Sequence, residues 1–348
     1  MKISFKKWFI FTLTGFSVLA LLYLFLVYFC YRSFNGDIIW IRNCCAVKEN
    51  IVRNLQGNKI IFLGGSATLF GIRTEDVQKK LGVPCVNLGV HAGLEIDYMV
   101  FWVKKILKSG DVVICSMEYP YFLYDGVIRN ITLEYAFTYD RAFIRSMSLT
   151  EKIKNAARIS PPKLAISFAK WLLGKNRQEA KQGYNSASLN ENGDETSNVG
   201  RRETDRRLRF ARPMEIMRGR FQETAGLRII KDFYSWCKIN NIVLYVTFAN
   251  TLYFEDYDSA PYRDYFLNLE NYLREHDIAR IGAPADFFFP REFFYDTQYH
   301  LNSAGVTIRT GQLIEMMNNL NIGRNLRNRE LAVEGNGSRT RSAPGSRP

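Results

Sequence analysis

The hydrophobic pattern begins with one long apolar run near the amino terminus. Residues 8–31 carry no charge over 24 positions, and at about 1.5 Å per residue they cross a hydrocarbon core of about 30 Å. Lys2, Lys6 and Lys7 precede the run, which favours a cytoplasmic amino terminus and an extracytoplasmic main domain. We therefore expect residues 1–31 to form a cytoplasmic end and a single-pass anchor in the cell membrane.

A cleaved signal peptide is the alternative for this run. Its apolar region is typically about 7–15 residues long and is followed by small residues at the cleavage site. Here the apolar run is longer and ends in Tyr-Phe-Cys-Tyr, so the pattern favours an uncleaved anchor. Residues 32–57 then predict a juxtamembrane connection with a short helix.

Short β-rich runs and helical patterns alternate along the rest of the chain. The runs at 59–63, 84–89, 111–117 and 242–248 predict buried strands, and the patterns at 74–82, 94–110, 222–240, 261–276 and 303–320 predict helices. This alternation predicts βαβ units and hence a mostly parallel sheet flanked by helices, an α/β domain over residues 58–322.

Two segments depart from this alternation. Residues 126–220 predict an insertion with helical stretches, a polar loop (183–200) and a segment with eight arginines in twenty residues (201–220). The insertion either caps the cleft or faces the membrane, and a solvated charged segment is the alternative. Residues 323–348 are polar, basic and without periodicity, so we expect them to be disordered.

Composition and charge narrow the function classes. Hydrophobic residues make up 47% and charged residues 23% of the 348 residues, which is typical of a folded globular chain. The net charge of +13 suits anionic lipid or acidic polysaccharide. No nucleic-acid-binding signature appears, so we expect no nucleic-acid partner. The six cysteines form no CxxC pair and no Cys/His spacing, so we expect no metal and no cofactor.

The first segment with candidate chemistry is FLGGSATLFGI (62–72). A predicted strand ends in Gly-Gly-Ser, which places the Ser66 hydroxyl at the carboxyl edge of the sheet, where open α/β sheets bind ligands. Amides at the following helix entrance suit a developing oxyanion. The alternatives are a serine that caps a helix and a phosphate-binding loop, although the GxxxxGK[ST] pattern is missing.

The second segment is FYDTQYHLNSAG (294–305). His300 lies just before the last predicted helix, and Asp296 lies four residues earlier. A serine nucleophile needs a neighbouring base, and an imidazole base needs an acceptor on its other nitrogen. The alternative is a histidine that only forms local hydrogen bonds.

Together with VNLGVHAG (86–93), these blocks resemble the SGNH/GDSL hydrolase superfamily. The closer likeness is to its membrane-anchored branch, with DltD-like D-alanyl transfer proteins and alginate O-acetylation proteins. The resemblance implies a flavodoxin-like sheet, Ser66 as nucleophile, His300 as base and Asp296 as orienting acid. It also implies an oxyanion hole formed by the Ser66 and Gly89 amides.

Two features depart from the superfamily pattern. Asp usually stands three residues before His, whereas here the spacing is four. The usual Gly-x-Asn-Asp block is replaced by SMEYPYF (116–122), which puts Glu118 where an amide donor is expected. Asn87 or Asn250 would then complete the oxyanion hole.

By this resemblance, the reaction is acyl transfer through an acyl-serine. The expected substrates are acyl groups of a cell-surface polysaccharide, with water (esterase) or a sugar hydroxyl (O-acyltransferase) as acceptor. A multi-pass membrane acyltransferase is the expected partner. The alternative is a non-catalytic scaffold or binding protein of the same fold in surface-polymer modification or export.

Overall fold

The computed structural model describes residues 4–178, 185–200 and 206–328. The chain divides into two compact units: unit 1 comprises residues 1–42 and 128–185, and unit 2 comprises residues 43–127 and 186–348. The predicted insertion at 126–220 is therefore divided, with its helical part in unit 1 and its polar and arginine-rich part in unit 2.

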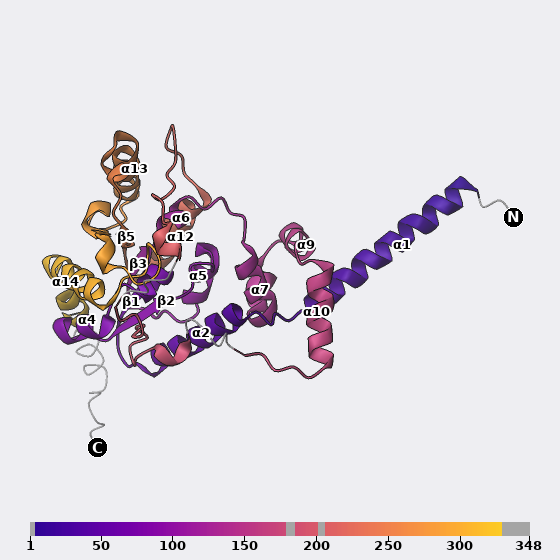
Figure 1. Ribbon diagram of the computed structural model, residues 1–348, viewed down its shortest axis with the longest axis horizontal. Coiled ribbons are helices and arrows are strands. Elements are labelled where there is room, and N and C mark those ends of the chain that lie inside the picture. The colour runs from indigo at the N-terminus through magenta and orange to yellow at the C-terminus, as the bar shows by residue number, and fades with distance from the viewer. Residues whose placement is uncertain (1–3, 179–184, 201–205, 329–348) are drawn as a thin grey trace, which may run out of the picture. The chain divides into compact units, whose positions relative to one another are not determined.

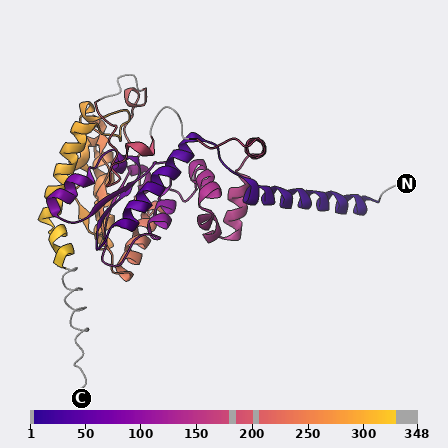
Figure 2. The same cartoon turned by 90° about the horizontal axis from the view of Figure 1, so that it is seen from below.

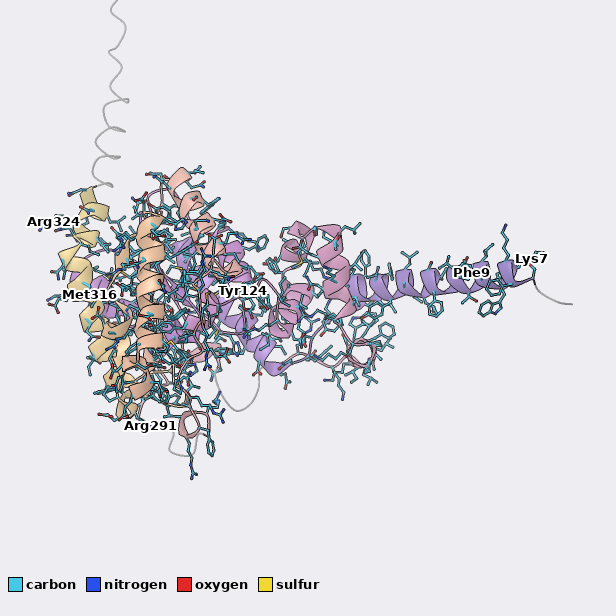
Figure 3. The ribbon with its side chains drawn as sticks, turned by 90° about the horizontal axis from the view of Figure 1, so that it is seen from above. Lys7, Phe9, Tyr124, Arg291, Met316 and Arg324 are labelled. Atoms are coloured by element: carbon cyan, nitrogen blue, oxygen red, sulfur yellow. The ribbon has the colours of Figure 1, made fainter. Side chains whose placement is uncertain are left out.

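Unit 1 is helical. It contains α1 (Phe5–Phe25) with its π-helical continuation η1 (Leu26–Cys30), the start of α2 (Gly36–Asn54), α7 (Asn130–Tyr139), α8 (Arg141–Ser146), α9 (Leu149–Ala157) and α10 (Pro161–Leu172). Together α1 and η1 form an apolar helix that is long enough to span a membrane, where the sequence predicts an anchor. Figure 3 shows the α1 side chains, among them Lys7 and Phe9, standing outward around the helix.

Unit 2 is built on a parallel sheet. Its strands are β1 (Ile60–Gly64), β2 (Cys85–Gly89), β3 (Val112–Met117), β4 (Val243–Phe248) and β6 (Arg280–Ile281), in the order β2-β1-β3-β4-β6. Every residue of β1, β2 and β3 is buried, as expected for a parallel sheet with both faces covered. The α/β class and the four predicted strands are confirmed, whereas β6 is too short to leave a pattern.

Helices cover both faces of this sheet. On one face α4 (Thr74–Leu81) packs against α14 (Ser303–Asn319), and on the other α5 (Ile96–Val103) packs against α12 (Ala225–Ile239) (Figures 1 and 2). The chain passes from β4 to β6 through α13 (Ala260–Glu275). Shorter elements are α3 (Ser66–Leu69), α6 (Tyr119–Phe122), α11 (Arg206–Arg209), β5 (Thr251–Leu252), β7 (Phe288–Phe289) and the 3-10 turns Ser186–Ser188, Glu255–Asp258, Pro284–Phe287 and Arg291–Phe293.

Two segments without hydrophobic periodicity have defined structure. In the predicted polar loop, the buried carboxylate of Asp194 accepts hydrogen bonds from the amides of Thr74 (2.9 Å) and Glu75 (3.1 Å), so it caps α4 from a distant part of the chain. Residues 322–328, at the start of the tail predicted to be disordered, are helical, and Ile322 and Leu326 are buried there. The rest of that tail, 329–348, lies outside the described residues, as do 201–205 of the arginine-rich segment.

Candidate active site

The candidate site lies where the sheet changes its winding direction. Strand order reverses between β1 and β3, which are paired with Leu63 opposite Cys115. In open α/β sheets, the crevice outside the carboxyl ends of the strands at such a switch point is the usual ligand site. The residues that follow these two strand ends are Gly65-Ser66 and Glu118.

A tight turn places Ser66 at the first position of α3. A Cβ on Gly64 would lie 2.1 Å from the Ser116 carbonyl oxygen, and one on Gly65 would lie 2.4 Å from a carboxylate oxygen of Glu118. The two glycines are therefore required by the close approach of β3 and the residue after it. The Ser66 side chain is half-buried.

Glu118 holds this turn through its carboxylate. The buried side chain accepts hydrogen bonds from the amides of Gly65 (3.0 Å) and Ala67 (2.8 Å), on either side of Ser66. Burial raises the pKa of Glu118, and the bonds from the Ala67 and Gly65 amides oppose the shift. The residue that stands where an amide donor was expected is thus an acceptor that fixes the backbone around the serine.

Arg309 supports the same turn from α14. Its fully buried guanidinium donates to the Ala67 carbonyl (3.0 Å), to Ser116 Oγ (2.8 Å) and to Asn250 Oδ1. Burial lowers the pKa of Arg309 to about 9, although the nearby Glu118 carboxylate opposes this shift. Arg309 is not among the residues predicted from the sequence, where its one signal is its position on the same stripe of α14 as the buried Val306 and Leu313.

The Asp296 and His300 side chains meet in the loop before α14. An antiparallel bridge between Phe294 and Leu301 folds this loop back on itself, and the Tyr295 amide donates to the His300 carbonyl (2.8 Å). His300 Nδ1 then lies 2.8 Å from Asp296 Oδ1, with the aspartate side chain 0% exposed. With Nδ1 donating to this carboxylate, Nε2 is the nitrogen that accepts a proton.

Asp296 has a second partner in the arginine-rich segment. Its Oδ2 lies 3.2 Å from Nη2 of Arg207, whose side chain is about half-exposed. Arg291 also binds this segment, by donating to the Leu208 carbonyl (2.8 Å). The start of the described arginine-rich segment is therefore in contact with the loop that carries Asp296.

His300 lies against the turn that carries Ser66. Its ring stacks on Phe70 with a centroid distance of 4.3 Å. The Phe70 amide donates to the Ser66 carbonyl (2.9 Å), so the two side chains are one helical turn apart on the same face. Asn198 joins the two segments by donating to the carbonyls of Phe70 (3.1 Å) and Leu301 (2.7 Å).

Comparison with known proteins does not assign the chain to a family. A scan against protein-family models finds no match for the chain, and a search of curated proteins finds no significant match.

The other predicted oxyanion donors form bonds within the protein. The Gly89 amide donates to Asn87 Oδ1 (2.8 Å), and Asn87 Nδ2 donates to the carbonyls of Thr68 and Ile72 (both 3.1 Å). Asn250 Nδ2 donates to the Tyr299 carbonyl (2.8 Å). Ser66 is the first residue of α3, so its own amide has no acceptor within that helix.

The other two histidines form hydrogen bonds to nearby backbone groups, and two of the cysteines lie within the sheet. His91 Nδ1 accepts from the Gly93 amide (2.8 Å), and His276 Nδ1 lies 2.8 Å from the Tyr272 carbonyl. Cys85 and Cys115 are buried in β2 and β3, where burial raises the pKa of both thiols. Among the described residues there is no group of three His, Cys, Asp or Glu side chains that could hold a metal ion.

Proposed function

We propose that the chain is a serine esterase or O-acyltransferase of the SGNH/GDSL type, with Ser66 as nucleophile, His300 as base and Asp296 as the acid that orients it. One observation carries the proposal. The Asp296–His300 pair, joined at 2.8 Å, stacks through its imidazole on Phe70, one helical turn from Ser66. The parallel sheet with a switch point at this turn supports it.

The reaction begins with attack of Ser66 Oγ on an ester carbonyl while His300 Nε2 takes the hydroxyl proton. The tetrahedral intermediate collapses, the C–O bond to the leaving alcohol breaks, and the imidazolium returns the proton to that alcohol. An acyl-serine remains. Water or a sugar hydroxyl then gives its proton to His300 and attacks the acyl-serine, which releases the acid or the new ester and restores Ser66.

The oxyanion of the tetrahedral intermediate needs hydrogen-bond donors. We assign the Ser66 amide as its first donor, because Glu118 fixes the amides on both sides of it. In this conformation the Gly89 amide and both Asn87 side-chain hydrogens are bound within the protein. Loss of one oxyanion donor costs about 10²–10³ in rate, so we expect slow turnover or a rearrangement of the Gly89 loop when substrate binds.

The substrate class is the one that the resemblance to the membrane-anchored SGNH/GDSL branch implies, and the expected location agrees with it. The apolar helix over residues 5–30 suits a membrane anchor, and Lys6 and Lys7 at its start favour a domain outside the cytoplasm. We propose acyl groups of a cell-surface polysaccharide as substrate and a multi-pass membrane acyltransferase as the partner that delivers them.

Hydrolysis of an aryl acetate by the purified chain tests the reaction. We expect Ser66→Ala and His300→Ala to lower kcat by at least about 10² with unchanged thermal unfolding. Ser235→Ala and His276→Ala are the matched controls, because Ser235 Oγ donates to the Lys231 carbonyl and His276 Nδ1 lies by the Tyr272 carbonyl, four residues earlier in each case. Equal loss in the controls, or full activity without Ser66, would contradict the proposal.

The thin oxyanion hole favours a second candidate, a non-catalytic scaffold of the same fold in surface-polymer modification or export. Acylation of the polymer in the native cell separates the two. A scaffold predicts that deletion abolishes acylation while Ser66→Ala and His300→Ala leave it unchanged. An enzyme predicts that the two variants behave like the deletion.

A further inference from the structure

Unit 1 presents an apolar surface on α10. Positions 164 and 167 of this helix are buried, whereas Ile166, Leu172 and Leu173 are 55%, 64% and 71% exposed. At 100° per residue, these three share one outward face with the exposed Ala169, and Ala165 and Phe168 lie at the edge of this face that is turned toward α1. Surface helices of water-soluble domains normally turn polar residues outward, so this face suits a non-aqueous surrounding.

The preceding helix, α9, repeats the pattern. Leu149 and Ile153 are four residues apart on one face and are 73% and 47% exposed. The polar residues Glu151 and Lys154 lie on the other side of the helix. Both helices of this hairpin therefore direct apolar side chains outward.

The hairpin is bound to the apolar helix α1. The Tyr23 hydroxyl donates to the carbonyls of Ala156 (3.1 Å) and Ile159, at the corner between α9 and α10. An apolar pocket of about 370 Å³ lies between α1 and α10, lined by Leu22 and Leu26 on one side and by Phe168 on the other. In Figure 1, α10 crosses the end of α1.

The position of Tyr23 sets the depth of this corner. A hydrocarbon core of about 30 Å takes about 20 residues of helix, and a span that begins after Lys7 ends near Val27. Tyr23 is four residues before that end, which corresponds to about 6 Å inside the core. Amphipathic helices that lie on a membrane bury their apolar face about 5–10 Å deep.

The charge of this region suits a lipid surface. Residues 141–178 contain nine Lys and Arg but only one acidic residue, Glu151. Basic residues on the polar side of an amphipathic helix attract anionic headgroups. Trp171, which is 61% exposed next to Phe168, is a residue type enriched at the membrane interface.

We propose that α9 and α10 form an interfacial hairpin whose apolar faces lie in the lipid bilayer at the level of the headgroup boundary, beside α1. The partner is the bilayer itself, because the apolar surface continues that of α1 and is surrounded by basic residues. The inference rests on the membrane location of α1 in the proposed function but not on the Ser66 chemistry.

Depth measurement on the full chain tests the hairpin. The chain is reconstituted in phosphatidylcholine/phosphatidylglycerol vesicles with single spin-labelled cysteines in a Cys30→Ser background. Labels at Ile166→Cys and Leu172→Cys report the hairpin, Phe16→Cys reports α1, and Lys238→Cys on α12 reports the aqueous phase. We expect oxygen to reach positions 166, 172 and 16 several-fold better than a water-soluble nickel chelate, with the reverse at 238.

Three results would overturn the inference. Nickel access at 166 and 172 places the hairpin in water, and shielding from both reagents means that a protein, such as a second copy of this chain, covers the face. Nickel access at 16 as well means that α1 does not span the bilayer. Esterase activity of the same preparations is measured separately, so failure of the hairpin and failure of the Ser66 chemistry are distinguishable.

Discussion

At the residue scale, the Asp296–His300 pair decides whether the chain can perform base catalysis. An aspartate four residues before a histidine can reach it because the 294–301 loop folds back through the Phe294–Leu301 bridge. Asp296→Asn keeps the shape but removes the charge that stabilises an imidazolium. We expect kcat for hydrolysis of an aryl acetate to fall about 10²–10⁴-fold. Circular dichroism of the variant checks that it is still folded.

Arg207→Ala is the matched control for this change. It removes the half-exposed partner of Asp296 but leaves the carboxylate and its bond to the imidazole. We expect a smaller loss of kcat than in Asp296→Asn, since the buried carboxylate keeps its charge and its hydrogen bond to the imidazole. If Asp296→Asn were no more damaging than Arg207→Ala, the carboxylate would not have the orienting role.

Glu118 is the residue whose role differs most from expectation. Glu118→Gln removes one of the two acceptors for the Gly65 and Ala67 amides, so we expect lower activity and a loss of about 1–3 kcal/mol in the free energy of unfolding. Glu223→Gln, which alters exposed ion pairs with Arg228 and Lys231, is the control.

The Glu118 carboxyl of the wild type makes stability depend on pH with a defined sign. Because folding raises the pKa of Glu118, its contribution to stability is largest below the ordinary glutamate pKa and decreases as the pH rises through the raised value. Between the ordinary glutamate pKa and the raised value, the free energy of unfolding of the wild type should therefore fall relative to that of Glu118→Gln. Chemical denaturation at a series of pH values measures this difference. A difference that does not change with pH would contradict the buried, titrating carboxylate.

At the element scale, local pattern was sufficient for the strands that build the sheet. β1 to β4 each contain a short β-rich, mainly apolar run, because all of β1, β2 and β3 and most of β4 are buried. The sequence pattern does not predict β6, because its two residues, Arg280 and Ile281, are too few to form an apolar run. It also misplaces the end of α5. The sequence pattern predicts a helix up to Gly110, but α5 ends at Val103. The chain then continues in tight turns, in which the Lys105 amide donates to the Trp102 carbonyl three residues earlier.

Lys48 shows how an element is fixed by a buried charge. The side chain on α2 donates to the carbonyls of Asn87 on β2 and Gly193, each at 2.5 Å, and is fully buried. Burial lowers its pKa to about 8 from 10.5. The unfolded chain then binds more protons between these values, so Lys48 adds stability as the pH rises from about 8 to 10.5.

Replacement by methionine tests this linkage. Relative to Lys48→Met, the wild type should gain up to about 3 kcal/mol in the free energy of unfolding across that window, while Lys238→Met on the surface of α12 should show no such trend. Parallel pH curves for wild type and Lys48→Met would mean that the ammonium is not buried as the structure has it.

At the scale of the whole molecule, the candidate site depends on contacts that no local pattern contains. The glycines, Ser66, Asp296 and His300 could be proposed from short blocks and from the carboxyl-end rule for α/β sheets. Arg309 on α14 and Asn198 in the polar loop could not, because each joins segments that are more than one hundred residues apart in the chain. The division into two units is likewise a property of long-range packing.

The net charge of +13 also belongs to this scale. If the arginine-rich segment binds an anionic polymer, as the sequence suggests, affinity for a polyuronate should fall steeply between 0.05 and 0.5 M salt, because screening shortens the Debye length from roughly 14 to 4 Å. A neutral dextran is the control ligand, measured by the same titration. An affinity for the polyuronate that does not change with salt would contradict the electrostatic interpretation.

The central claim is that the Ser66 hydroxyl is activated by His300. Mass spectrometry of the chain after reaction with a fluorophosphonate tests it most directly. We predict one covalent adduct, located on the peptide that contains Ser66, with labelling abolished in Ser66→Ala and strongly slowed in His300→Ala. A folded wild-type chain that remains unmodified, or an adduct that persists in Ser66→Ala, would contradict the claim.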